Sequence, residues 1–262
     1  MKTFNYHSAK DIKEAVKLSS SSSAYLAGGM TTIPSIKLGL ATYKDVIDIK
    51  NIKKISGIKI NAKTVTIGAT TKHVEVANSK DIKKKIPSLA ILAEGIGDPQ
   101  VRNRGTIGGS IANNDPAADY PSACLALNAT IHTNKRKIES DKFFKGIFET
   151  DLKKGELIEA IEFQLPEKSS YAKYPNPASR YAIVGVYIAK YKQEVRVAVT
   201  GASSSGVYRS KELEDSLSKN FSSSSIENTN ISTKDLNSDI HASAEYRSHL
   251  IKVMAKRALE SC

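Results

Sequence analysis

The feature that most constrains this chain is a polar, glycine-rich stretch, residues 105–121, which lies between two apolar helical segments. Three glycines within five residues, Gly105, Gly108 and Gly109, indicate a backbone with positive φ or close approach by another group. The adjacent glycines and Ser110 are expected to leave several N–H groups free to point at one anion, such as a pyrophosphate. This stretch therefore predicts an anion-binding loop.

Polar side chains follow these glycines. Asn113, Asn114, Asp115 and Asp119 offer donors and acceptors to a sugar or a ring edge. Asp119 also precedes the apolar run 120–127, as the N-cap of a helix would. Taken alone, the stretch is better interpreted as a loop with glycine turns and a capped helix.

A second motif of the same kind changes that interpretation. The run Ala27-Gly28-Gly29-Met30-Thr31-Thr32 follows a short apolar strand candidate, residues 25–27, and opens a helix candidate, residues 33–40. A strand, a Gly-Gly turn and a helix in this order offer N–H groups to phosphate. The spacing is neither GxGxxG nor GxxxxGK[ST]. Two such motifs about eighty residues apart predict one extended ligand held from two sides.

Five segments carry a resemblance to a known family. They are AGGMTTIPSIKLGL (27–40), TIGGSIANNDPAADYPSACLALNA (106–129), GELIEAIEF (155–163), YAKYPNPASRYAIVGV (171–186) and ASAEYRSHLIKVMAKRAL (242–259). In this order they resemble the FAD-binding medium subunit of molybdenum hydroxylases, the xanthine dehydrogenase family, and especially the aerobic carbon monoxide dehydrogenase type. The resemblance extends over essentially the whole chain.

The resemblance also implies which residues bind FAD. It places the pyrophosphate and ribityl group on the two glycine motifs, polar contacts on Asn113 and Asp119, and an apolar contact on Leu157 or Ile158. The implied cofactor-binding residues are Ala27, Gly28, Gly29, Met30, Thr31, Thr32, Thr106, Gly108, Gly109, Ser110, Asn113, Asp119, Leu157, Ile158, Lys173 and Tyr181. No metal ligands are implied, and no catalytic residue is assigned with certainty.

Lys173 and Tyr181 match family positions close to the isoalloxazine ring, so the resemblance makes them candidates for tuning the flavin. A tyrosine ring can stack on the flavin, and a lysine charge favours the anionic reduced state. Without the resemblance, Tyr181 would be interpreted as an aromatic residue of a core strand and Lys173 as a solvated lysine. The five histidines are dispersed without metal-ligand spacing, and each is predicted to lie on the surface or to be a hydrogen-bonded structural residue.

The implied function is that of the FAD-carrying subunit of a molybdenum hydroxylase, passing electrons from an iron–sulfur small subunit to an external acceptor. Molybdopterin and 2Fe-2S clusters are expected only in partner subunits, and the implied assembly is a dimer of heterotrimers with a molybdopterin large subunit. Two alternatives stay open: a free-standing FAD-dependent oxidase or dehydrogenase, and a basic binder of nucleic acid or acidic proteins. The substrate also stays open among carbon monoxide, purines, aldehydes and N-heterocycles.

Composition narrows these alternatives. The formal charge of +12 makes nucleic acid a candidate partner. The lysines are scattered and lack interleaved aromatic residues, so we expect a solvated surface that partly faces an acidic partner or the anionic cofactor. Cys124 and Cys262 are too few to ligate an iron–sulfur cluster. Neither a signal peptide nor a transmembrane segment is expected. We expect a cytoplasmic protein, with membrane association through partners left open.

The pattern of elements predicts an α+β fold, and the resemblance implies the FAD-binding fold of the PCMH type. Residues 1–168 are expected to form the FAD-binding domain, with a small parallel β-α-β subdomain (1–54) and a mixed or antiparallel α+β subdomain (55–168). Residues 169–262 are expected to form a C-terminal domain of antiparallel strands and helices. Prolines and serines in residues 167–179 predict a boundary or a loop there.

Overall fold

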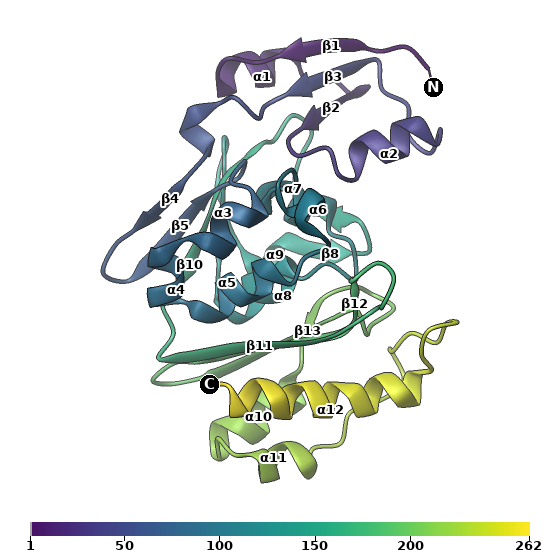
Figure 1. The fold of residues 1–262 in the computed structure, drawn as a ribbon. Helices are drawn as coiled ribbons and strands as arrows, with labels where there is room; N and C mark the ends of the chain where they lie inside the picture. Colours follow the sequence, from purple (N-terminus) through teal and green to yellow (C-terminus); the bar gives the residue numbers. More distant parts are fainter. Residues whose placement is uncertain (1) are drawn as a thin grey trace.

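The computed structural model describes residues 2–262. Its N-terminal part is a small parallel sheet with two helices. Its strands pair in the order β1-β3-β2, and all pairs are parallel, as predicted. Ala15, Ile47 and Ile55 are buried in its own core. The elements are β1 (Asn5–Ser8), α1 (Ile12–Leu18), β2 (Ser23–Leu26), α2 (Thr32–Lys37) and β3 (Asp45–Asp48), as Figure 1 shows.

The middle part is built on a five-stranded antiparallel sheet of order β4-β5-β10-β6-β7. The strands of this part are β4 (Ile58–Ile60), β5 (Thr64–Gly68), β6 (Thr130–Thr133), β7 (Lys137–Glu139), β8 (Phe144–Gly146), β9 (Glu149–Thr150) and β10 (Ile158–Gln164). The helices are η1 (Lys53–Ile55), α3 (His73–Asn78), α4 (Lys80–Lys85), α5 (Pro87–Glu94), α6 (Pro99–Arg102), α7 (Ile107–Asn113), α8 (Tyr120–Ala126) and α9 (Ser140–Phe143).

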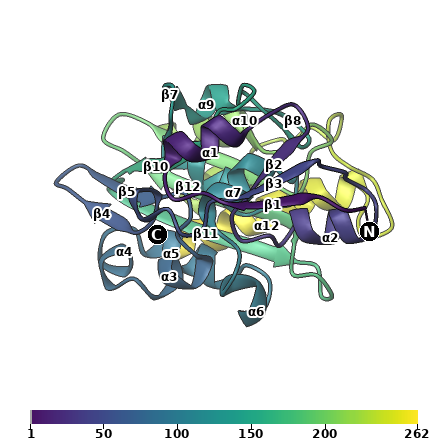
Figure 2. The same ribbon diagram turned by 90° about the horizontal axis from the view of Figure 1, so that it is seen from above.

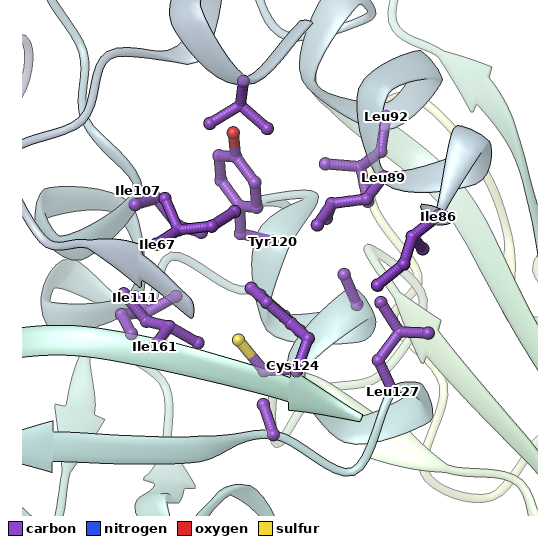
Figure 3. Close-up of a cluster of buried hydrophobic side chains, with 14 of the residues drawn as sticks. Ile67, Ile86, Leu89, Leu92, Ile107, Ile111, Tyr120, Cys124, Leu127 and Ile161 are labelled. Carbon is purple, nitrogen blue, oxygen red and sulfur yellow. The ribbon is translucent and has the colours of Figure 1, made fainter. Parts of the chain in front are cut away.

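The core of the middle part forms because apolar faces of helices and sheet meet there. Tyr120 and Cys124 of α8 lie beside Ile107 of α7, Leu89 of α5 and Ile161 of β10, and all five are fully buried (Figure 3). Burial of apolar surface is the main favourable contribution to folding. Cys124 is thus a small core residue, as predicted.

The C-terminal part is a four-stranded antiparallel sheet covered by helices on its outer face. Its elements are β11 (Lys168–Pro175), β12 (Ala182–Lys190), β13 (Val195–Thr200), β14 (Tyr208–Arg209), α10 (Lys211–Lys219), α11 (Ser223–Glu227) and α12 (Ala244–Glu260). The predicted loop at 167–179 is therefore wrong over most of its length, because β11 occupies it, whereas the predicted boundary stays a prediction. Since β11 is the edge strand, Pro175 can end it without breaking a ladder inside the sheet.

The C-terminal sheet packs directly against the middle part. Figure 1 shows it between α5 and α8 on one side and α10 and α12 on the other. Tyr187 of β12 belongs to the middle core, and its hydroxyl lies 2.6 Å from the Ser88 hydroxyl of α5. The division into domains at residue 168 stays a prediction.

The glycine-rich stretch is not mainly a loop. Residues 107–113 form α7, and the Thr106 hydroxyl caps it by accepting the Gly109 N–H at 3.2 Å. Asn114, with φ of 44°, ends the helix. Viewed from above, the N-terminal strands lie over α7 (Figure 2). Within residues 2–262, no helix combines the length and the apolar character needed to cross a bilayer.

Candidate functional site

A cavity of about 510 Å³ lies where the N-terminal part, α7 and the turn before β12 meet. Every predicted cofactor-binding residue except Lys173 lines it. These residues are Ala27, Gly28, Gly29, Met30, Thr31, Thr32, Thr106, Gly108, Gly109, Ser110, Asn113, Asp119, Leu157, Ile158 and Tyr181. Its size lies in the range of small-molecule sites. The fold thus brings the two glycine motifs to one site.

The first glycine motif exposes a row of backbone donors. Gly29 has φ of 77°, which lets the chain turn sharply between β2 and α2. A Cβ on Gly28 would overlap the Arg104 carbonyl, so this glycine lets the motif pack directly on residues 104–105. In the described chain, the N–H groups of residues 28–32 donate to no protein acceptor. Such a row at the start of a helix can hold a phosphate.

The second motif differs from the prediction, because its N–H groups are already bonded. Gly108 donates to the Ala69 carbonyl at 2.9 Å, Gly109 to the Thr106 hydroxyl, and Ser110 to the Thr106 carbonyl at 3.0 Å. A Cβ on Gly109 would meet only the Thr106 Oγ1 at 3.0 Å and the Ala27 Cβ at 3.9 Å. The second motif therefore supplies open space opposite the first motif rather than free donors.

The charged side chains around the cavity leave the backbone N–H groups as the main donors to an anion. Within the described residues, Arg180 is the only arginine or lysine that lines it, whereas Asp115, Asp119 and Glu156 also line it. Burial raises the pKa of Asp115. With so few cationic side chains, binding of an anion here depends mainly on the backbone N–H groups of residues 28–32.

His73, at the start of α3, lines the cavity but was not among the predicted binding residues. Its side chain is buried, and its Nδ1 has no hydrogen-bond partner among residues 2–262, so the expected surface or hydrogen-bonded role is wrong. Burial, helped by the nearby Arg102 charge, lowers its pKa to about 4. The ring lies 5.3 Å from that of Tyr120, between centroids. Nothing in its sequence context indicated this position.

Asp119 is not an N-cap in the sense predicted, because its carboxylate makes no capping bond to α8. It instead accepts a hydrogen bond from the Tyr171 hydroxyl and pairs with Lys173 Nζ at 2.9 Å. Burial raises the pKa of Asp119, and Lys173 and Tyr171 oppose that shift. Lys173 lies behind Asp119, outside the cavity wall.

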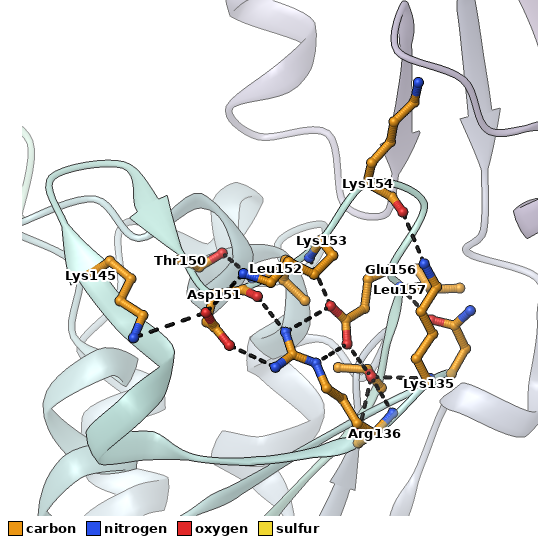
Figure 4. Close-up of polar contacts among 12 residues, drawn as sticks. Lys135, Arg136, Lys145, Thr150, Asp151, Leu152, Lys153, Lys154, Glu156 and Leu157 are labelled. Atoms are coloured by element: carbon orange, nitrogen blue, oxygen red, sulfur yellow. Dashed lines mark hydrogen bonds and ion pairs between the residues drawn. The ribbon is translucent and has the colours of Figure 1, made fainter.

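Glu156 anchors the segment that carries Leu157 and Ile158 to the cavity wall. Its carboxylate accepts bonds from the Arg136 guanidinium, at 3.0 and 3.1 Å (Figure 4). It also accepts a bond from the Thr133 hydroxyl at 2.7 Å. Burial acts to raise the pKa of Glu156, but these bonds and one from a backbone N–H outweigh it and lower the pKa. The ion pair between Arg136 and Glu156 therefore has a structural role: it holds the segment with Leu157 and Ile158 on the apolar side of the cavity.

Tyr181 lies at the cavity rim, about half exposed. It follows Arg180, whose φ of 63° is unusual for a residue with a long side chain. Burial of the ring and then the charges of Asp115 and Asp119 raise the pKa of the Tyr181 hydroxyl. The hydroxyl is therefore protonated at neutral pH, and the ring offers an apolar face beside the cavity.

Comparison with known proteins identifies the family. Residues 2–167 match the family described as "FAD binding domain in molybdopterin dehydrogenase". The chain belongs to this family. It is 33% identical to the glyceraldehyde dehydrogenase medium chain of Sulfolobus acidocaldarius, over 98% of this chain and 97% of that protein. It is 31% identical to the carbon monoxide dehydrogenase medium chain of Hydrogenophaga pseudoflava, over 98% of this chain and 96% of that protein.

Solved structures agree with these relatives. Carbon monoxide dehydrogenase from Hydrogenophaga pseudoflava superposes with a TM-score of 0.87 at 30% identity, covering 99% of this chain and 96% of that chain. Reconstituted carbon monoxide dehydrogenase from Oligotropha carboxidovorans gives 0.89 at 27%, covering 99% and 97%. The chain is thus an FAD-binding medium subunit of the molybdenum hydroxylase family and an oxidoreductase subunit, and the other cofactors belong to partner subunits.

Proposed function

We propose that this chain carries electrons within a molybdenum hydroxylase complex, from an iron–sulfur small subunit to an external acceptor. The observation that carries the proposal is the row of unbonded N–H groups at residues 28–32, which faces a cavity shared with a second glycine motif. This arrangement fits the dinucleotide of FAD, which has an anionic diphosphate and an extended shape. When bound, FAD supplies the redox chemistry itself.

Backbone and side-chain groups of this chain would bind and orient the cofactor. We assign the diphosphate to the N–H groups of residues 28–32, with the open space over Gly109 allowing close approach. Ser110, Asn113 and the other polar residues on the same wall offer hydrogen bonds to the ribityl group. The buried Leu157 and Ile158 on the cavity wall and the Tyr181 ring at its rim offer apolar surfaces suited to an aromatic ring system, where they would limit access of water.

The partners in the proposal follow from what this chain contains. Its two cysteines, one of them in the core, are fewer than the four protein ligands of an iron–sulfur cluster. Electrons would therefore reach the cavity from a cluster on another subunit, docked on a surface of this basic chain. A molybdopterin large subunit would complete a carbon monoxide dehydrogenase-like assembly, a dimer of heterotrimers.

The test is anaerobic reduction of the purified, FAD-loaded chain. We expect dithionite to bleach the flavin absorbance, whereas carbon monoxide, glyceraldehyde or nicotine leave it oxidised. Adding the iron–sulfur and molybdopterin subunits should then allow one of these substrates to bleach it. Carbon monoxide and glyceraldehyde are tried first because the medium chains of their dehydrogenases are similar over nearly the whole length of this chain.

One result would contradict the proposal. Rapid bleaching by a substrate without any partner would favour a free-standing FAD-dependent oxidase or dehydrogenase. A yellow, FAD-loaded preparation also separates both flavoprotein functions from that of a basic binder of nucleic acid or acidic proteins.

A further inference from the structure

The Lys173 ammonium group has all of its hydrogen-bonding capacity occupied within the protein. It lies 2.9 Å from Asp119 Oδ1, 2.9 Å from the Gly95 carbonyl oxygen and 3.0 Å from the Arg180 carbonyl oxygen. An ammonium group has three N–H donors, so these three acceptors satisfy it. Its side chain is 9% exposed. Lys173 therefore has no donor left for a molecule in the cavity.

These three acceptors come from separate parts of the chain. Gly95 follows α5, Asp119 precedes α8, and Arg180 lies in the turn between β11 and β12. Tyr171 and Lys173 lie on the same face of β11, because they are two residues apart, and both contact Asp119. Lys173 thus ties the turn to the body of the molecule beside the cavity.

Most other hydrogen bonds of the turn that Lys173 holds lie within the turn, apart from two long contacts: Arg180 Nη1 to the Gly97 carbonyl at 3.4 Å and Asn176 Nδ2 to His241 Nδ1 at 3.5 Å. The Asn176 N–H donates to the Tyr181 carbonyl at 2.7 Å, and the Arg180 N–H donates to the Asn176 carbonyl at 2.8 Å. Arg180 has φ of 63°, a conformation that a non-glycine residue keeps only where its surroundings hold it. The bond from Lys173 to the Arg180 carbonyl is such a restraint. Tyr181 is the next residue, so its ring position depends on this peptide.

We infer that Lys173 is a positioning residue that keeps the Tyr181 ring at the cavity wall by holding the Arg180 carbonyl. This inference rests on the proposed function, because it concerns the position of Tyr181 beside the flavin that the same cavity would bind. Lys173 affects a bound flavin through Tyr181 and not by its own charge. The contact with Asp119 supports this, because a carboxylate at 2.9 Å offsets much of the field of the ammonium group in the cavity.

The first measurement is amide hydrogen exchange of residues 176–182 in the flavin-free chain. We expect Lys173→Met to speed exchange there by about tenfold, because the turn opens locally without its restraint. Lys168→Met is the matched control, since Lys168 is an exposed lysine on the same strand, and it should leave this exchange unchanged. Neither flavin nor a partner is needed, so failure of the proposed electron transfer would not affect this result.

Lys173→Met leaves Asp119 without its cationic partner in a buried place, which can prevent folding. The double variant Lys173→Met/Asp119→Asn removes both charges while still deleting the bond to the Arg180 carbonyl. It should show the same faster exchange at residues 176–182. Unchanged exchange in a folded variant of either kind would overturn the inference.

The second measurement is a double-mutant cycle on the midpoint potential of the bound FAD. Lys173→Met should shift the midpoint potential when Tyr181 is present. In the Tyr181→Ala background the same substitution should give less than about a third of that shift, because the effects of coupled residues are not additive. A shift of equal size in both backgrounds would mean that the Lys173 charge acts on the flavin directly, and it would reject the positioning role. Lys168→Met again serves as the control for net charge.

Discussion

At the scale of single residues, His73 is the side chain whose surroundings most constrain its chemistry. It lines the cavity, yet it is buried against Tyr120 and near Arg102. Burial and the cationic neighbour both disfavour the imidazolium form, so its pKa is about 4. At neutral pH the ring is therefore uncharged, and it can line the site of an anionic cofactor without contributing a charge.

This lowered pKa predicts a loss of stability in acid. The pKa of about 4 in the folded state lies below the ordinary value of 6.5, so the unfolded chain binds more protons between these pH values. Stability should fall as pH drops from 6.5 towards 4, by about 3 kcal/mol from this group. His73→Phe should remove that part of the pH dependence, as measured by urea unfolding at a series of pH values.

The matched control is His249→Phe, because His249 is an exposed histidine on α12. It should leave the acid dependence of the unfolding free energy as it is in the parent chain. An acid dependence of equal slope in the parent and in His73→Phe would show that His73 is not the group responsible.

At the scale of elements, the two glycine motifs make different contributions and should respond differently to substitution. Gly109 lies on α7 without positive φ, and a side chain there would crowd only the Thr106 Oγ1 at 3.0 Å while filling part of the cavity between the motifs. We therefore expect Gly109→Val to fold and to weaken FAD binding by at least about tenfold, or 1.4 kcal/mol. Flavin fluorescence titration of the apoprotein and a thermal melt measure the two effects.

Two further substitutions complete this comparison. Gly28→Ala places a methyl group on the Arg104 carbonyl, so it should lower stability by about 1–3 kcal/mol as well as FAD affinity. Gly39→Val, at φ of 74° with nothing near its Cβ, should cost stability while leaving the cavity intact. Unaltered FAD affinity in Gly109→Val would reject the assignment of α7 to the diphosphate site.

The two motifs and their shared ligand site were predictable from the sequence. The difference between them, free N–H donors in the first and bonded N–H groups in the second, was not. Glycine content cannot show that the Gly108 N–H is bonded to Ala69, because that bond crosses from α7 to the end of β5. Likewise, Lys173 and Asp119 are 54 positions apart, and only the packed fold brings them together. The parallel and antiparallel sheets were predicted because local alternation and turns encode them.

At the scale of the whole molecule, the C-terminal sheet completes the core of the part that carries the glycine motifs. Tyr187, Ala189 and Ala198 of that sheet belong to the same apolar cluster as α5 and α8. The buried Arg196 donates to the Leu125 carbonyl at 2.9 Å and to Asp141 at 2.7 Å. The family match ends at residue 167, but the packing continues past that point.

This shared core predicts that residues 1–168 cannot fold as a unit without the remainder. Removing residues 169–262 would expose the apolar faces of α5 and α8, leave Asp119 without Lys173 and Tyr171, and delete Tyr181 from the cavity. A domain that folds alone needs its own closed core. We expect the 1–168 fragment to lack a cooperative urea transition and to retain no FAD, whereas the full chain shows both.

Adding the separate fragment 169–262 should restore FAD binding in part if the interface forms between the two pieces. A 1–168 fragment that unfolds cooperatively and holds FAD as tightly as the full chain would show instead that the boundary at residue 168 separates two independent domains.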